Sequence, residues 1–313
     1  MTALEAEVRA PAPYRLPRGS DDRTLRISGG VATRLLHVGG APVLARAWHR
    51  RDGFVVLRAE AVDPATVERR RAHAEAPAAA GREELEVAID RLRFVLALDQ
   101  DLSDFHRRFR RDPLVGPLIR RMPSFRPRRR VWPWEALAAA VVGQLIEARR
   151  AVTIERRIVG RWGAGLGTGR GALRDVPGAA TIAGRAPAEI ESMDLSPNRA
   201  LALWRVARAV AAERCPIETP AGDRRLLAMP QIGPWTVQCL GLFGRGEMDS
   251  LPAGDLGYIK LVGRLAGLGR RATVEEVEEF YAPYEPYRGL VGSLTLAGLH
   301  RTISQGAPLR LAA

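Results

Sequence analysis

Short runs of alternating apolar and polar residues fill the N-terminal part of the chain, a period of two that is typical of half-buried strands. Pairs of turn residues separate the runs, namely Gly29-Gly30, Gly39-Gly40 and Asp52-Gly53. The pattern predicts strands around Leu25 and Ile27 and over residues 31–37, 43–48 and 54–59, joined into a small antiparallel sheet. A helix from about Pro64 to Ala76 and a linker at 74–81 are expected to follow.

Apolar residues recur at helical spacing from residue 83 onward. The clearest stripe starts just after Pro133, a natural first-turn residue, and includes Trp134, Leu137, Val141, Val142, Leu145 and Ala148. Further helices are expected near 222–229, 234–243, 256–266, 273–283 and 288–303. The chain therefore divides into a sheet-plus-helix region at 1–82 and a helical region at 83–313, an α+β fold that is mostly α.

A very short link joins two of these helical runs within LLAMPQIGPWTVQCLGLF at 226–243. Pro230 is expected to stop the first helix, Gly233 to take a positive φ, and Pro234 to open the second helix. Backbone N–H groups at such a helix start form a phosphate site that suits DNA of any sequence. Taken alone, the Pro-x-x-Gly-Pro pattern favours an ordinary corner between two helices.

The chain carries 48 basic residues, a net charge of +13 and a pI near 11.0. Such a charge points to a polyanionic partner, and nucleic acid is the commonest one. A solvated, arginine-rich surface is the alternative reading. Phospholipid fits less well, because no long basic amphipathic segment is present.

Cofactor chemistry finds little support in the composition. The two cysteines, Cys215 and Cys239, cannot supply a Cys₄ cluster or a zinc ribbon, and the five histidines are scattered. No cofactor or metal is expected. No apolar run has the length of a membrane span and the N-terminus lacks a signal-peptide core, so we expect a cytoplasmic protein without membrane contact.

Two segments together resemble the helix-hairpin-helix DNA glycosylases. MPQIGPWT at 229–236 is similar to that family's Leu-Pro-Gly-Ile-Gly-x-x-Thr signature, and DSLPAGDLG at 249–257 supplies the later Gly/Pro-rich loop and aspartate. The resemblance is to the alkylation-repair branch, the DNA-3-methyladenine glycosylase II type. It extends to the segments at 132–151 and 284–292 and covers about residues 20–303.

The resemblance implies a helical core in two lobes behind the N-terminal sheet, in a monomer that acts on damaged double-stranded DNA. It leaves open a structural monovalent cation at the hairpin carbonyls. Two positions depart from the family pattern. Gln231 replaces the first hairpin glycine, where a left-handed residue would cost about 1–2 kcal/mol. Glu147 stands where a small hydroxyl residue is common, so its carboxylate must point away from phosphate.

Asp255 aligns with the family's catalytic aspartate. Cleavage of a glycosidic bond develops positive charge at C1′ and the ring oxygen, which a nearby carboxylate stabilises while it orients water. The alternative is that Asp255 only caps the helix that follows it, and the two roles are compatible. Asp249 is interpreted as a solvated loop residue.

The lysine content bears on the subclass. Glycosylases that also cleave the strand use an amine at C1′, and the resemblance places that lysine where this chain has Trp235. The sole lysine, Lys260, lies about 140° around the helix from Asp255. A monofunctional enzyme without lyase activity is expected.

The base pocket is assigned from the resemblance and from helical spacing. Trp235 and Tyr287 take aromatic positions of the alkylation-repair branch, and a cationic alkylated purine is attracted to such faces. Trp134 and Tyr258 are weaker candidates. Cys239, one turn after Trp235, is expected on the same side and widens the pocket. Core packing is the competing role for each of these residues.

DNA contacts follow from the same alignment. Leu145 matches the apolar wedge that fills the gap left by a flipped base, and Gln144 matches its polar neighbour. Gln231, Gly233 and Thr236 are the hairpin's candidate DNA contacts. A basic run, Arg126 with residues 128–130, is a further candidate for phosphate binding.

These features predict a base-excision-repair glycosylase that releases alkylated purines such as 3-methyladenine and 7-methylguanine. Two alternatives stay open: a glycosylase for oxidised or deaminated bases, and a damaged-DNA-binding protein without catalysis. The latter would give Asp255 no role.

Overall fold

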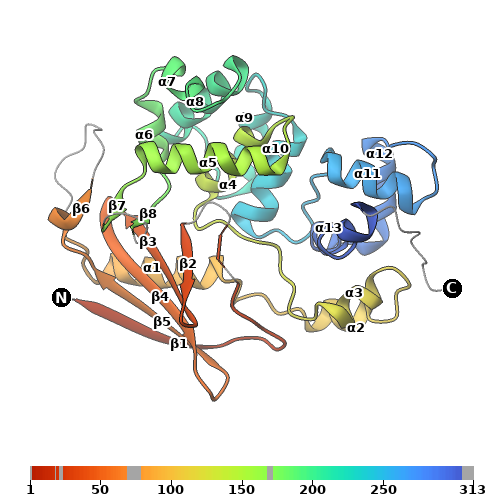
Figure 1. Ribbon diagram of the computed structural model, residues 1–313, viewed down its shortest axis with the longest axis horizontal. Helices are drawn as coiled ribbons and strands as arrows, with labels where there is room; N and C mark the ends of the chain where they lie inside the picture. Colours follow the sequence, from red (N-terminus) through yellow and green to blue (C-terminus); the bar gives the residue numbers. More distant parts are fainter. Residues whose placement is uncertain (1, 18, 21–23, 69–78, 168–171, 305–313) are drawn as a thin grey trace.

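Five strands form one antiparallel sheet at the N-terminal end of a mostly helical chain (Figure 1). The computed structural model describes residues 2–17, 19–20, 24–68, 79–167 and 172–304. The strands are β1 (Ala3–Arg9), β2 (Leu25–Ser28), β3 (Val31–Val38), β4 (Ala41–His49) and β5 (Phe54–Ala61). Their spatial order is β1-β5-β4-β3-β2, so the first strand closes one edge of the sheet.

The glycine pairs form the turns that the sequence predicts. Gly29-Gly30 and Gly39-Gly40 all have positive φ, as two-residue hairpins between twisted strands require. β1 was not predicted, because its apolar positions are mostly alanine and leucine rather than β-branched residues. It pairs with β5 from Ala3 opposite Glu60 to Arg9 opposite Phe54.

The predicted helix at Pro64–Ala76 is wrong over the residues that the structure describes. Asp63 accepts a hydrogen bond from Ala65 N and caps only a single 3₁₀ turn, η1 (Pro64–Thr66). The chain then enters β6 (Val67–Glu68), which pairs with β7 (Gly165–Leu166) in a small sheet completed by β8 (Leu173–Arg174). Pairing with a distant strand overrides the local helical pattern. The linker at 74–81 lies mostly outside the described residues.

Helix α1 (Arg82–Val95) covers one face of the five-stranded sheet. Its Leu85 and Leu92 are buried in one core with Leu36, Val43 and Leu57 from the strands. The core of the sheet therefore extends across the division that the sequence pattern places at 82/83.

The remaining helices agree with the predicted ranges only in part. They are α2 (Ser103–Phe109), α3 (Val115–Arg121), α4 (Pro133–Gly143), α5 (Ala148–Trp162), α6 (Ala179–Ala183), α7 (Pro187–Glu191), α8 (Pro197–Ala211), α9 (Asp223–Leu227), α10 (Pro234–Cys239), α11 (Leu256–Leu265), α12 (Val274–Tyr281) and α13 (Arg288–Ser304). The stripe that begins at Trp134 ends as a helix at Gly143, before Leu145 and Ala148, and the helices at 103–109, 115–121, 148–162, 179–183 and 187–191 were not predicted individually. Short 3₁₀ turns, η3 (Pro220–Gly222) and η5 (Ala282–Tyr284), precede α9 and follow α12.

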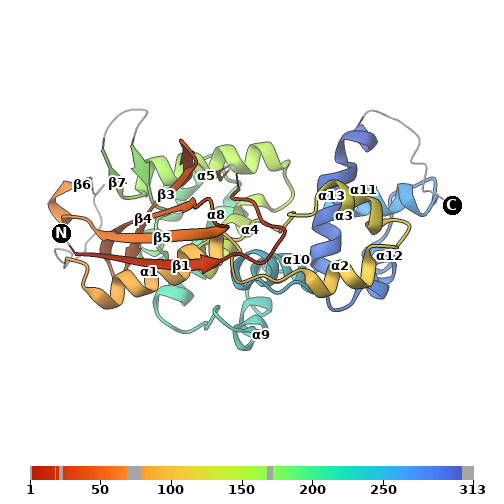
Figure 2. The ribbon, with the colours of Figure 1, turned by 90° about the horizontal axis from the view of Figure 1, so that it is seen from below.

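The helices pack as two lobes with separate cores. Helices α4–α10 form the first lobe around residues such as Leu137, Val206 and Leu240. The second lobe joins α2 and α3 to α11–α13, although more than a hundred residues separate them in sequence (Figure 2). Phe105 and Leu290 belong to its core. The α+β fold with two helical lobes and an N-terminal sheet is thus confirmed.

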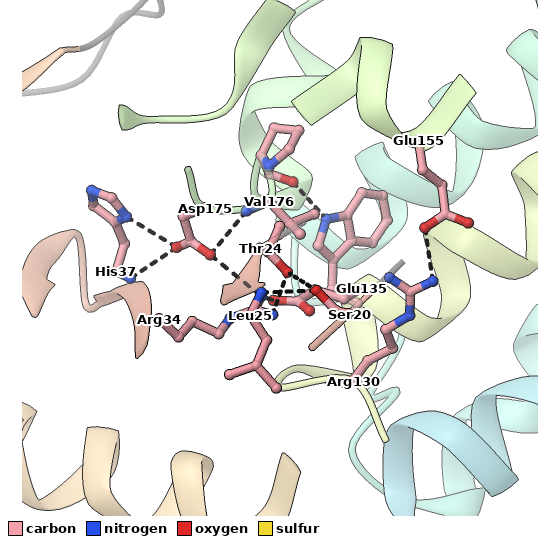
Figure 3. A network of polar contacts seen from close by, with 12 residues as sticks. Ser20, Thr24, Leu25, Arg34, His37, Arg130, Glu135, Glu155, Asp175 and Val176 are labelled. Carbon is pink, nitrogen blue, oxygen red and sulfur yellow. Dashed lines mark hydrogen bonds and ion pairs between the residues drawn. The ribbon is translucent and has the colours of Figure 1, made fainter. Parts of the chain in front are cut away.

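A buried ion network fastens the sheet to the first lobe (Figure 3). Arg34 of β3 lies 2.7 Å from a Glu135 carboxylate oxygen of α4 and 3.6 Å from Asp175, and its side chain is 2% exposed. Thr24 accepts a further hydrogen bond from the same guanidinium at 2.5 Å. Buried charges are tolerated only when paired, so this network fixes how the sheet meets α4.

Removing the cation of this network should destabilise the whole fold. Arg34→Met leaves the buried Glu135 and Asp175 carboxylates without their partner, and we expect the free energy of unfolding in urea to fall by about 3–5 kcal/mol. The matched control is Arg82→Met, whose exposed guanidinium pairs with Glu86 on the surface of α1. That change should cost less than about 1 kcal/mol. Equal losses in the two variants would contradict the assignment.

Candidate active site

The link between α9 and α10 reverses the chain at Gln231. This residue has φ +70°, whereas Gly233 has φ −110° and ψ 178°, which is extended backbone. The prediction of a positive φ at Gly233 is therefore wrong. Gly233 is the N-cap of α10, a position that takes extended backbone, so the left-handed turn falls on Gln231 instead. A non-glycine residue there costs about 1–2 kcal/mol.

Gln144 connects the end of α4 to this hairpin. Its side-chain amide donates to the Gln231 carbonyl oxygen at 2.8 Å and to Thr236 Oγ1 at 3.0 Å. Thr236 is buried, so its hydroxyl serves this contact inside the protein. Two of the predicted DNA-contacting side chains thus bind each other and hold the hairpin against α4.

Leu145 follows directly and is fully exposed. Its relative exposure is 104%, and its φ of +57° lies in the left-handed region that branched residues rarely adopt. A large apolar side chain in solvent with strained backbone gains nothing from packing within the protein. Among the large apolar side chains of the described residues, this one is the most exposed. Glu147, two residues further on, is exposed.

The hairpin's second helix continues as a π-helix. α10 gives way at Leu240 to π-helical backbone over Leu240–Arg245, a geometry often found next to functional sites. Arg245 is almost fully buried and pairs with Asp223 at the start of α9 and with Glu247. This clamp, which holds the two arms of the hairpin together, was not predicted, because no local pattern relates Asp223 to Arg245.

Asp255 stands at the start of α11, in the second lobe. It is the N-cap, and its Oδ1 accepts a hydrogen bond from Gly257 N at 2.7 Å. The side chain is half-buried. The cap engages one carboxylate oxygen, so capping and catalysis are compatible in this geometry.

Two candidate pocket residues lie within electrostatic reach of Asp255. Burial, and then the Asp255 carboxylate, raise the pKa of the Cys239 thiol well above its usual value. Burial also raises the pKa of Tyr258, with the charge of Asp255 as a smaller contribution. Both groups are therefore neutral at physiological pH. The structure brings Cys239 of the first lobe and Asp255 and Tyr258 of the second to one place.

Trp235 fills the space between the end of α4 and the Asp255 loop. A Cβ added at Gly254 would lie 3.6 Å from Trp235 Cβ, and one added at Gly143 would lie 3.7 Å from the far edge of the indole. The indole N–H is buried and has no hydrogen-bond partner among the described residues. A ligand with a hydrogen-bond acceptor at this position would satisfy the unpaired indole N–H.

The loop that carries Asp255 is anchored on α13. Asp249 accepts hydrogen bonds from the backbone N–H of Arg288 at 3.1 Å and from its guanidinium at 2.9 Å. Asp249 is therefore not the solvated loop residue that the sequence predicted. Gly289 allows the close approach, because a Cβ there would lie 2.1 Å from the Ser250 carbonyl oxygen.

The contacts of Tyr287 and Trp134 are with residues other than Asp255, Trp235 and Cys239. Tyr287 donates to Asp104 at 2.8 Å and packs its ring on Phe105 of α2. The Trp134 indole N–H donates to the Pro177 carbonyl oxygen. Trp134 itself lies nine residues before Gly143, which is about 13 Å along α4. The geometry gives both residues packing contacts, and their place in the base pocket stays a prediction.

Three residues of the predicted phosphate-binding arginine run have partners inside the protein. Arg126 donates to the carbonyl oxygens of Pro11, Pro13 and Gln100. Arg129 is buried and pairs with Asp99, and Arg130 pairs with Glu155 (Figure 3). The prediction that these arginines serve DNA is wrong, because their guanidinium groups join the sheet, the linking segment and the first lobe.

The Asp249–Arg288 contact should make stability depend on pH. Burial alone would raise the pKa of Asp249, but the hydrogen bonds and charge of Arg288 outweigh it, and the pKa falls below its usual 3.8. The carboxylate therefore stabilises the fold above that pH, and the contribution is lost as pH falls through the lowered value. In urea unfolding at pH 7, Asp249→Asn should cost about 1–3 kcal/mol.

The difference between wild type and Asp249→Asn should shrink as the pH falls below 3.8. Asp90→Asn, on the exposed face of α1, is the matched control and should leave stability nearly unchanged at each pH. A difference that does not vary with pH would contradict an ionised Asp249.

Comparisons with known proteins agree with this geometry. No protein-family model matches the chain. The chain is 26% identical over 229 residues to a Mycobacterium tuberculosis protein named "probable bifunctional transcriptional activator/DNA repair enzyme AlkA", which covers 72% of this chain and 45% of that protein. It is 22% identical over 197 residues to a Bacillus subtilis DNA-3-methyladenine glycosylase, covering 61% and 65%. The chain thus spans less than half of the first relative and just under two thirds of the second.

Solved structures share the fold over almost the full chain. A 3-methyladenine DNA glycosylase from Archaeoglobus fulgidus aligns with a TM-score of 0.75 at 19% identity, covering 96% of this chain and 99% of that one. An 8-oxoguanine glycosylase/lyase from Clostridium acetobutylicum, bound to DNA, aligns with a TM-score of 0.63 at 12% identity, covering 89% and 98%. The chain thus shares the fold of these DNA glycosylases and is similar in sequence to proteins named for alkylation repair, the resemblance that the hairpin and the following aspartate predict.

Proposed function

We propose that this protein is a monofunctional DNA glycosylase that hydrolyses the N-glycosidic bond of alkylated purines. The observation that carries the proposal is the half-buried Asp255 carboxylate beside Trp235 and Cys239, at the junction of the lobes. Relatives named for 3-methyladenine repair support the substrate class. The substrate is double-stranded DNA, so the proposed location is the cytoplasm, in association with the nucleoid.

DNA would be held first through its backbone. Gly233 has open space where a Cβ would stand, and its extended φ suits any residue, so packing within the protein does not require glycine there. A bare backbone at this point leaves room for a phosphate near the first N–H groups of α10. The net charge of +13 supplies affinity that is independent of sequence and weakens with salt.

Leu145 would occupy the gap in the duplex when the damaged base leaves the stack. Its side chain is already in solvent, and Gln144 fastens its position to the hairpin that binds the backbone. Inserting an apolar side chain costs unstacking energy but bends the DNA toward the protein. Leu145 and the hairpin that would contact phosphate are therefore held in a fixed relative position.

The flipped base would enter beside Trp235. An N3- or N7-alkylated purine carries positive charge, and an indole face attracts it by about 0.5–2 kcal/mol. The unpaired indole N–H offers a donor to a base or sugar acceptor. Cys239 would add a small neutral side chain to this side of the base pocket.

Bond cleavage would then be assisted by charge stabilisation. As the C1′–N bond breaks, its electron pair leaves with the base, which its positive charge makes a good leaving group. Asp255 stabilises the cationic sugar, and a water oxygen bonds C1′ and gives its proton to the carboxylate or to solvent. The proposed step uses only the Asp255 carboxylate and a water molecule. Among the described residues, no group of three or more His, Cys, Asp or Glu side chains could hold a metal ion.

Strand cleavage is not part of the proposal. A lyase needs an amine that attacks C1′. At the hairpin position where the resembling lyases carry that lysine, this chain has Trp235. The sole lysine, Lys260, is exposed on α11.

No described helix has both the length and the apolar character needed to cross a membrane.

Replacing Asp255 tests the chemistry. Asp255→Asn keeps a side-chain oxygen for the Gly257 cap but removes the charge. We expect the single-turnover release of 3-methyladenine and 7-methylguanine from methylated duplex DNA to fall by about 10²–10³-fold or more, with DNA affinity nearly unchanged. Lys260→Ala is the control and should keep full activity, with abasic strands left intact. Wild-type protein that binds this DNA but releases no base would refute the proposal.

Truncating the wedge tests base flipping separately. Leu145→Ala removes a side chain that packs on nothing, so the melting temperature should not fall, while base release should drop roughly tenfold or more. Val274→Ala, which shortens another exposed apolar residue at the start of α12, should change neither quantity. Full activity in Leu145→Ala would show that this residue does not fill the gap.

A further inference from the structure

A cavity lies between the sheet and the first lobe, and Asp255 is not among its lining residues. Its volume is about 600 Å³, within the range of small-molecule sites. The β3–β4 turn, α1, the start of α4, the end of α5 and the segment 175–181 contribute to its walls. Trp235, Cys239 and Asp255 are not among its lining residues. It is therefore distinct from the proposed base pocket.

Three tryptophans give this cavity aromatic walls. Trp132, Trp134 and Trp162 line it, and the Trp134 indole is fixed by its hydrogen bond to the Pro177 carbonyl oxygen at 2.9 Å. The Arg91 guanidinium lies 4.6 Å from the centre of the Trp132 ring and that of Arg185 lies 6.0 Å from the centre of the Trp162 ring, so each of these rings already has a cation on one face. Small residues, including Gly40 and Ala180, leave space between the aromatic walls.

The charge of the cavity is opposite to that of the protein. Glu135, Asp175 and Glu218 line it against one cation, Arg91. Arg34, buried beside Glu135 and Asp175, offsets one more negative charge. Three carboxylates against two guanidinium groups leave a net charge of −1, which favours a cationic ligand over a phosphate.

Polar groups in the cavity are held in place. Asp175 is buried and accepts hydrogen bonds from the backbone N–H groups of His37 and Val176 (Figure 3). His37 Nδ1 lies 3.0 Å from the same carboxylate, which orients the ring. His37 Nε2 is buried and has no hydrogen-bond partner among the described residues. A ligand with its own polar edge would satisfy this nitrogen.

We propose that this cavity binds a planar aromatic cation of one or two rings, such as an N-alkylated heterocycle. The tryptophan walls select a flat ring, the carboxylates select positive charge, and His37 Nε2 supplies a polar contact. The site is independent of the chemistry proposed at Asp255, since no residue of that cluster contributes to it. Its occupant would bridge the sheet and the start of α4.

Calorimetric titration with N-methylquinolinium tests the proposal, and the neutral 1-methylquinolin-2-one provides a comparison of similar shape. We expect the cation to bind roughly tenfold or more tightly than the neutral compound, because only the cation gains from the carboxylates and the indole faces. Absence of binding at millimolar cation, or equal binding of both compounds, would overturn the proposal.

Two variants locate the binding. Ala180→Phe places a bulky ring at an exposed position of the cavity wall and should abolish binding, and Glu218→Gln, also exposed, should weaken it several-fold. Glu191→Gln makes the same charge change outside the cavity, on α7, and should bind like wild type. All three should keep the melting temperature of the wild type within a few degrees, which shows correct folding. Wild-type affinity in both cavity variants would place the ligand elsewhere.

Discussion

The site depends on how Trp235 is packed between two glycines. Its side chain lies against the Asp255 loop at Gly254 and against the end of α4 at Gly143, so it packs where the two lobes meet. A Cβ at either glycine would be in ordinary van der Waals contact with Trp235. Because α11 starts immediately after this loop, the position of the proposed catalytic carboxylate follows from that packing. The Asp249–Arg288 contact fixes the same loop from the side of α13.

Two of the five non-glycine residues with positive φ in the described part of the chain lie where DNA is proposed to bind. Gln231 and Leu145 both have positive φ, and each costs about 1–2 kcal/mol that packing elsewhere must offset. Gln144 links the two positions, since it lies beside Leu145 and donates to the Gln231 carbonyl. The hairpin and Leu145 are therefore held in one arrangement before DNA is proposed to bind, and the conformational free energy of the two positive-φ residues must be offset by packing elsewhere in the fold.

Much of the fold was predictable from periodicity and turn chemistry, because the Gly-Gly turns and the helical stripes are local signals. The strand β1 and the pairing of Val67 with Leu166 were not, since both depend on partners far away in the sequence. The same limit applies to the site. The motif located Asp255 and the hairpin, but the partners of Asp249, Arg126 and Arg129 come from other elements, and only the structure shows that these charges are used internally.

The central claim is that Asp255 stabilises a positively charged sugar, and binding of a transition-state mimic tests it most directly. Duplex DNA carrying a pyrrolidine in place of the damaged nucleotide presents a cation near the C1′ position, whereas a tetrahydrofuran duplex is neutral. We predict that the wild-type protein binds the pyrrolidine duplex at least roughly a hundredfold more tightly, and that Asp255→Asn loses this preference while binding the neutral duplex normally. Equal affinity of wild type for the two duplexes, or an unchanged preference in the variant, would contradict the account.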